Sequence, residues 1–136
     1  MSASIDTYRS VNLGTTSPRQ VVIKLYEAAV RYLTEAEDGL KTGQPFQEPL
    51  GKARQIVGGL MAALNFEAGE LSQRLLQLYL FALDRIQTTG ATESDAGLAE
   101  VRKVLETLKS GWEAMPAEEA RQATPGVGAS GLNLRG

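Results

Sequence analysis

The stretch that decides the fold class is LAEVRKVLETLKSGWEAM, which spans residues 98–115. Its apolar residues recur at alternating steps of three and four, the spacing of a helix that buries one stripe against its neighbours. We expect this helix to begin between Thr92 and Asp95 and to end at Pro116. The apolar positions are Leu98, Val101, Leu105, Leu108, Trp112 and Met115.

Three further helices with helical apolar spacing precede this one. Ser17 can cap the first, the proline after it suits the first helical position, and Gly43 ends it. A second helix is predicted from about residue 48 to 65, and a third from about residue 70 to 88, before Gly90. The loops of about five or six residues favour antiparallel neighbours.

The predicted architecture is therefore an all-α, antiparallel up-down four-helix bundle over residues 17–116. Residues 1–16 precede it as an N-terminal segment with spaced apolar side chains, Tyr8 among them. Residues 117–136, in which glycines recur around Pro125, are expected to be a flexible C-terminal tail, because they cannot bury enough apolar surface to offset their ordering entropy.

Composition argues against several functional classes. The 136 residues include no histidine and no cysteine, so imidazole bases, thiol nucleophiles and the commonest metal ligands are missing. We therefore expect no enzyme, no metal site and no cofactor. A formal charge of −2 argues against nucleic acid as a partner. The longest apolar run, residues 78–83, is too short for membrane insertion, and the N-terminus lacks signal-peptide features, so we expect a cytoplasmic (cytosolic) protein.

The first and third helices carry more apolar surface than a four-helix bundle hides. Their apolar arcs span ~220° and ~200° on a helical wheel, whereas such a bundle asks each helix to bury about 100–140°. Phe81 stands apart on the polar side of the third helix. Two interpretations remain open. In the first, the bundle packs irregularly or dimerises and so buries these apolar side chains. In the second, the apolar surface that the bundle does not bury lines a groove for an amphipathic helix of a partner.

The N-terminal segment also has two interpretations. It can occupy such a groove as a tethered plug when no partner is present, or it can staple onto the first helix. The back of the second helix is smooth, which lets another backbone approach closely. We expect it to pack against a neighbour within the fold; a client helix and a hinge are the alternatives. Its small residues are Gly51, Gly58, Gly59 and Ala62.

Several short motifs follow one another in a definite order between residues 5 and 115. They are Tyr8-x-x-Val11, Thr16-Ser17-Pro18, Leu25-Tyr26-Glu27-x-Ala29, Leu60-Met61-x-x-Leu64-Asn65, Gly69-Glu70-x-x-x-x-Leu75-x-x-Leu78-Tyr79, Arg85-Ile86 and Trp112. In this order they resemble the flagellin export chaperones, the FliS family. The chain departs from the family pattern at Ala28, at Arg74 and at Leu80-Phe81, and the last change makes the third helix more apolar.

The resemblance implies a helical bundle that binds the C-terminal amphipathic segment of newly made flagellin and prevents its premature polymerisation before export. Other flagellar export proteins are further partners of this kind. Taken with the wide apolar arcs, the resemblance predicts a partner-binding surface on the N-terminal segment and on the first and third helices. The predicted site residues are Tyr8, Val11, Ile23, Tyr26, Leu76, Tyr79, Leu80, Phe81 and Leu83.

An alternative function stays open beside this one. The chain can be a self-associating helical-bundle adaptor, whose wide arcs bury against its own copy or another helical partner. A monomer and a homodimer are both compatible with the sequence.

Overall fold

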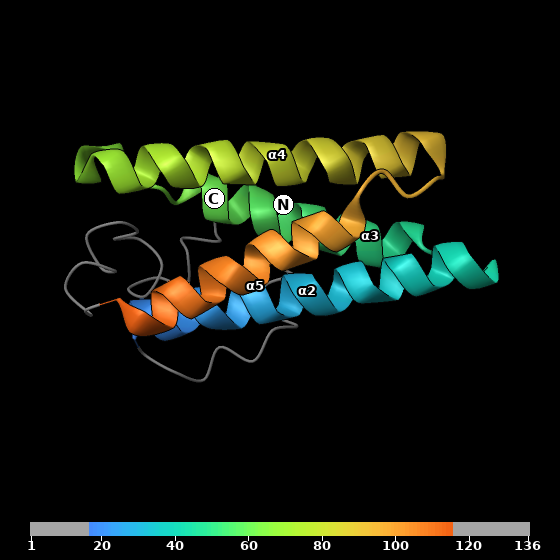
Figure 1. Ribbon diagram of the computed structural model, residues 1–136, viewed down its shortest axis with the longest axis horizontal. Coiled ribbons are helices and arrows are strands. Elements are labelled where there is room, and N and C mark those ends of the chain that lie inside the picture. The colour runs from blue at the N-terminus through green and yellow to red at the C-terminus, as the bar shows by residue number, and fades with distance from the viewer. Residues whose placement is uncertain (1–16, 116–136) are drawn as a thin grey trace.

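The computed structural model of the chain describes residues 17–115, which form four α-helices and no strand (Figure 1). The all-α prediction is confirmed. One 3-10 turn, η1, lies between the second and third of these helices. The elements are α2 (Pro18–Thr42), α3 (Gln47–Ala62), η1 (Phe66–Ala68), α4 (Glu70–Thr92) and α5 (Leu98–Ala114).

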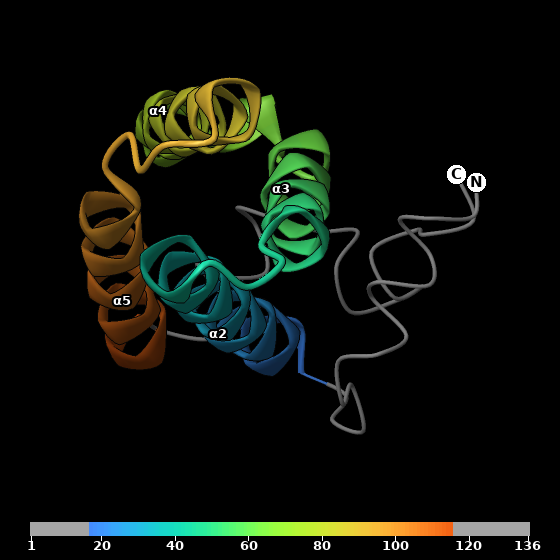
Figure 2. The same cartoon turned by 90° about the vertical axis from the view of Figure 1, so that its right-hand side faces the viewer.

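Successive helices run in opposite directions, so the predicted up-down bundle is confirmed (Figure 1). Seen from the end, α2, α3, α4 and α5 follow one another around a ring (Figure 2). The helix α2 packs closely against both α3 and α5, whereas α4 packs closely against α3 and more loosely against α5. The bundle is therefore tight on three sides and loose on the fourth.

The ends of α2 lie where its sequence signals predict. The Oγ atom of Ser17 accepts a hydrogen bond from the backbone N–H of Gln20 at 3.3 Å, and a proline occupies the first turn. At the other end Gly43 adopts the left-handed conformation, with a φ of 78°, and its N–H bonds to the carbonyl of Gly39. Both caps satisfy backbone groups that a helix end leaves unpaired.

The end of α4 lies further along the chain than the sequence predicts. The helix continues through Gly90 to Thr92, and α3 contacts it at this glycine. The side-chain amide of Gln47 donates to the Gly90 carbonyl at 3.3 Å, and a Cβ atom at Gly90 would lie 3.4 Å from the Leu50 side chain. The glycine costs helix stability of about 1 kcal/mol, which these contacts with α3 help to offset.

The start of α5 also differs from the prediction, because the helix begins at Leu98. Glu93 takes the left-handed conformation, with a φ of 57°, and ends α4. The Asp95 carboxylate then accepts hydrogen bonds at 2.8 Å from the backbone N–H groups of Gly97 and Leu98. These bonds turn the chain into α5 only after Asp95.

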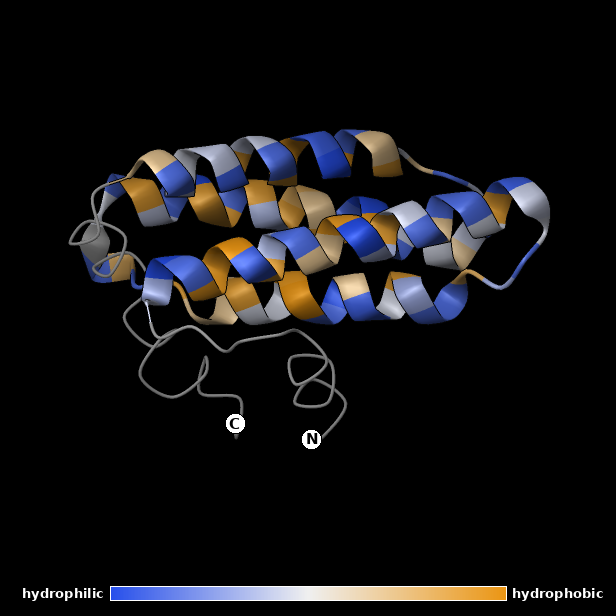
Figure 3. Ribbon diagram, turned by 90° about the horizontal axis from the view of Figure 1, so that it is seen from below, coloured by the Kyte–Doolittle hydropathy of each residue, from blue (hydrophilic) through white to orange (hydrophobic). Residues whose placement is uncertain are grey.

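The core is built around α2. Nearly all of its wide apolar arc is buried, because α3 covers one flank and α5 the other. Glu37, which interrupts this arc, is buried as well, and its carboxylate accepts hydrogen bonds from the Arg102 guanidinium of α5. Figure 3 shows hydrophobic and hydrophilic bands alternating along each helix. The buried apolar residues of α2 are Val21, Val22, Leu25, Tyr26, Ala28, Ala29, Tyr32, Leu33 and Ala36.

The two ends of the described chain lie at the same end of the bundle (Figure 1). The Arg19 guanidinium donates a hydrogen bond to the backbone carbonyl of Met115. The predicted N-terminal segment, residues 1–16, and the predicted tail, residues 117–136, lie outside the described residues. Among the helices between residues 17 and 115, none has the length and apolar character needed to cross a membrane.

Two of the four small residues on the smooth back of α3 have no close neighbour among the described residues. No described atom lies within 4 Å of the position that a Cβ would take at Gly51 or at Gly58. Both glycines lie inside a helix, where they cost stability, and no neighbour from residues 17–115 uses the space that they leave. Gly39 is the opposite case, because a Cβ there would lie 2.8 Å from the Pro45 carbonyl oxygen.

We predict that Gly58→Ala raises the free energy of unfolding by about 0.5–1 kcal/mol, since alanine restricts the unfolded chain and fits the helix. Gly39→Ala should lower it by roughly 1–3 kcal/mol through the clash with Pro45. Urea denaturation followed by circular dichroism measures both. A loss of stability in Gly58→Ala would mean that this face is packed.

Candidate partner-binding groove

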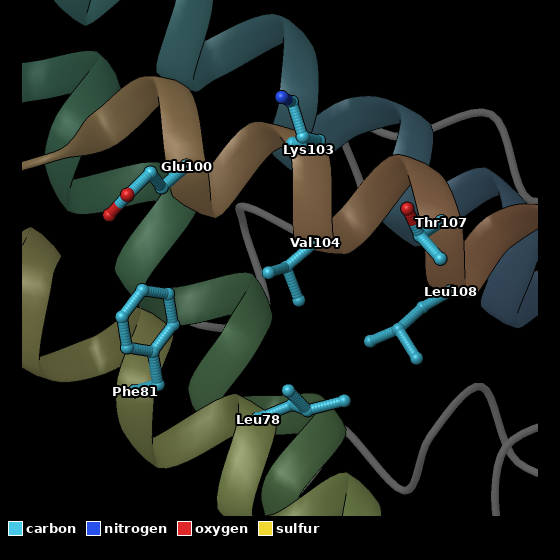
Figure 4. Close-up of a pocket in the computed structure, with 7 residues that line it drawn as sticks. All are labelled: Leu78, Phe81, Glu100, Lys103, Val104, Thr107 and Leu108. Atoms are coloured by element: carbon cyan, nitrogen blue, oxygen red, sulfur yellow. The ribbon is translucent and has the colours of Figure 1, made fainter.

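A groove of about 540 Å³ runs along the loose side of the bundle, between α4 and α5. Four apolar side chains line it, and Figure 4 shows those of α4 and α5 on its two walls. We call this the α4–α5 groove. It is lined by Leu78 and Phe81 from α4 and by Glu100, Lys103, Val104, Thr107 and Leu108 from α5.

The groove exists because, among the described helices, α4 has only one close neighbour, α3. Its innermost side chains pack in the core against α2 and α3, but α5 lies too far away to cover its other flank. Leu78, Phe81, Val104 and Leu108 are therefore only half-buried. Apolar side chains that stay partly wet lose the roughly 1.5–3 kcal/mol that full burial of each would contribute. A partner that covers them recovers this free energy.

The rim of the groove is polar and mixed in charge. Glu100, Lys103 and Thr107 are exposed along α5. On the α4 side, the Arg85 guanidinium lies 5.4 Å from the centre of the Phe81 ring, within the range of a cation–π contact. A floor of apolar groups with a polar edge is the usual composition of a surface that binds a peptide helix.

A buried hydrogen-bond network lies beside the groove. The indole Nε1 of Trp112 donates to the Tyr26 hydroxyl at 2.8 Å, and the Tyr26 and Tyr79 hydroxyls are 2.6 Å apart. The three side chains come from α5, α2 and α4, and each is almost fully buried. This Tyr26–Tyr79–Trp112 network therefore connects the two helices that form the groove through the helix beneath them.

Burial fixes the protonation state at the centre of this network. Desolvation raises the pKa of Tyr26 to about 12, and the hydrogen bonds from Tyr79 and Trp112 lower it only in part. The Tyr26 hydroxyl is therefore neutral at every physiological pH. It can accept from the indole and still exchange a hydrogen bond with Tyr79.

The predicted site residues fall into separate environments. Of the seven that lie between residues 17 and 115, Phe81 alone lines the groove. Tyr26 and Tyr79 are buried in the network, and Leu80 is exposed over 46% of its surface. Leu80 lies about 200° around the helix from Leu78, so it faces away from the groove. Of the remaining residues, Ile23, Leu76 and Leu83 are half-buried against the core, while Tyr8 and Val11 lie outside the described residues.

Sequence reasoning missed the α5 wall of the groove. Leu108 was assigned to the buried seam of its helix, and Val104 lies beside that seam, one turn before Leu108. Val104 was the available signal, because it widens the apolar arc of α5 on the side that faces α4. Among residues 17–115, no three acidic side chains gather closely enough to hold a metal ion.

Comparisons with known proteins point to one family. The family described as flagellar protein FliS matches residues 1–119. The flagellar secretion chaperone FliS of Vibrio cholerae is 29% identical over 125 residues, which cover 87% of this chain and 92% of that protein. The flagellar secretion chaperone FliSB of Pseudomonas aeruginosa is 30% identical over 100 residues, which cover 71% of this chain and 79% of that protein.

The raised pKa of Tyr26 predicts a loss of stability at high pH. The unfolded chain releases this proton near pH 10 and the folded chain only near pH 12, so the stabilisation is complete below pH 10 and disappears as the pH rises through 12. The difference in unfolding free energy between the wild type and Tyr26→Phe should therefore shrink by about 1 kcal/mol between about pH 9 and pH 11. Urea titrations at the two pH values measure it, and a constant difference would contradict the burial of this hydroxyl.

Proposed function

This chain belongs to the FliS family of flagellar proteins, and we propose that it is a cytoplasmic export chaperone whose client is the C-terminal region of flagellin. The observation that carries the proposal is the apolar α4–α5 groove on the loose side of the bundle. The flagellar secretion chaperones of Vibrio cholerae and Pseudomonas aeruginosa support the same class of activity.

The groove has the shape and chemistry that a client helix requires. Its two walls are antiparallel helices with apolar side chains at helical spacing, Leu78 and Phe81 on one and Val104 and Leu108 on the other. An amphipathic helix laid between them would act as a fifth helix of the bundle and would bury all four side chains. Helix-in-groove recognition of this kind selects for apolar anchors one turn apart.

Covering an amphipathic helix is useful because such a helix otherwise associates with its own copies. Flagellin that is held in the groove cannot use the same apolar face for polymerisation. The client segment orders itself as it binds, and this ordering subtracts several kcal/mol from the gross interaction energy. The complex is therefore specific but releasable, as a chaperone that delivers its client to an export channel requires.

We predict that Phe81→Glu weakens binding of a flagellin C-terminal peptide at least about tenfold, because a carboxylate in the groove loses solvation when the client covers it. Leu80→Glu should also weaken binding if the client wraps beyond the groove onto the outer face of α4. Isothermal titration calorimetry with the last few dozen residues of flagellin from the same cell measures both affinities.

Phe66→Glu is the matched control for these variants. Phe66 is an apolar residue exposed over 50% of its surface, but it lies in η1, outside the groove. Its substitution should leave the affinity unchanged. If Phe81→Glu binds the peptide as tightly as the wild type, the groove is not the client site. If the wild-type chain forms a tight dimer and binds no peptide, the self-associating adaptor is favoured.

The N-terminal segment is proposed to compete with the client for the same surface. Deleting residues 1–14 should therefore leave the affinity for the flagellin peptide unchanged or raise it, because a tethered competitor is removed. The same calorimetric titration compares the full chain with the truncated one. A large loss of affinity would show that the segment supports the site instead.

A further inference from the structure

The open state of the α4–α5 groove needs a physical explanation. Two neighbouring helices in a bundle normally approach until their side chains interdigitate, with axes about 8–10 Å apart. Closure here would remove Leu78, Val104 and Leu108 from water, and the hydrophobic effect favours that movement. Within residues 17–115, a feature of the packing can oppose it, whether or not the N-terminal segment that is proposed to compete for this surface lies in the groove.

The Tyr26–Tyr79–Trp112 network has the right position to do so. Tyr79 follows Leu78 directly in α4, and Trp112 lies one turn after Leu108 in α5. Each end of the network thus belongs to one wall of the groove, while Tyr26 in the middle belongs to α2, which is held firmly by α3 and α5. The position of α4 relative to α5 is transmitted through the two hydrogen bonds that meet at Tyr26.

The network also has the right energetics. Its bonds are 2.8 Å and 2.6 Å long, within a completely buried environment. Hydrogen bonds weaken steeply when distance or angle changes, and a buried N–H or O–H group that loses its partner is penalised strongly. Apolar contacts allow two helices to slide past each other, whereas the hydrogen bonds of this network allow very little change in the relative position of α4 and α5. The rings of Tyr26 and Tyr79 also pack against each other between α2 and α4, tilted at 51° with centres 6.5 Å apart.

We propose that the Tyr26–Tyr79–Trp112 network is a spacer that sets the separation of α4 and α5 and thereby keeps the groove open. The three residues are positioning residues, since they act on a partner only through the walls of the groove. The consequence for client binding rests on the proposed function, but the separation of the two helices is a property of this chain alone.

The separation can be measured directly with a pair of spin labels. The chain has no cysteine, so Gln77→Cys and Glu106→Cys, both at exposed positions, place one label on α4 and one on α5. Double electron–electron resonance then compares the wild-type background with Tyr26→Phe. That substitution removes the acceptor of the Trp112 indole and should shorten or broaden the distance distribution. An unchanged distribution overturns the spacer.

Two further variants separate the spacer from general stability. Ile86→Val removes one methylene from the buried face of α4 without touching a hydrogen bond, so it should lower stability and leave the distance unchanged. Tyr79→Phe breaks one of the two bonds and keeps the other, so it provides a milder test if Tyr26→Phe folds poorly. The spacer is contradicted if Ile86→Val changes the distance as much as Tyr79→Phe does.

The flagellin peptide gives the second readout. If the open form falls to about a tenth of the molecules in Tyr26→Phe, the apparent Kd rises about tenfold, while Ile86→Val keeps the wild-type Kd. A wild-type chain that binds no peptide contradicts the proposed function, and the label distances still decide the spacer. A wild-type chain that binds, combined with unchanged distances and unchanged Kd in Tyr26→Phe, contradicts the spacer and leaves the proposed function intact.

Discussion

The burial of α2 between α3 and α5 is the constraint on which the rest of the structure depends. A helix with an apolar arc this wide needs neighbours on two flanks. The helices α3 and α5 cover these flanks, and their positions are fixed by their packing against α2. The fourth helix, α4, closes the ring against α3 but meets α5 only loosely. The distribution of apolar surface among the helices therefore leaves the α4–α5 side loosely packed, and the proposed Tyr26–Tyr79–Trp112 spacer acts on that side.

Much of the fold could be predicted from local signals. Ser17 and Gly43 mark the ends of α2 because capping depends on a few adjacent residues, and the repeat from Leu98 to Met115 specifies one buried stripe. The end of α4 could not be predicted in the same way. Gly90 disfavours a helix by its propensity, yet α4 continues through it, and Gln47 from another helix bonds to its carbonyl.

The candidate site could be predicted only in part, because a helical wheel gives the amount of apolar surface and not the neighbour that covers it. The arcs of α2 and α4 are similar in width, yet the first is filled by the fold, whereas the second meets the groove at its edge, through Leu78. Phe81, which lies outside that arc, lines the groove beside it. On such a wheel Tyr26 and Tyr79 fall within the apolar arcs, and their position does not distinguish a core residue from a partner-binding one. Their hydroxyls meet in the core, which depends on the packing of three helices at once.

The contact between Arg19 and Met115 has a consequence for the topology of the bundle. The first turn of α2 contacts the end of α5, so the four helices return to the point where they began. A circular permutant, with residues 115 and 17 joined by a short linker and new termini opened between α4 and α5, would keep every helix pairing. The order of the helices along the chain is thus separable from the way in which they pack.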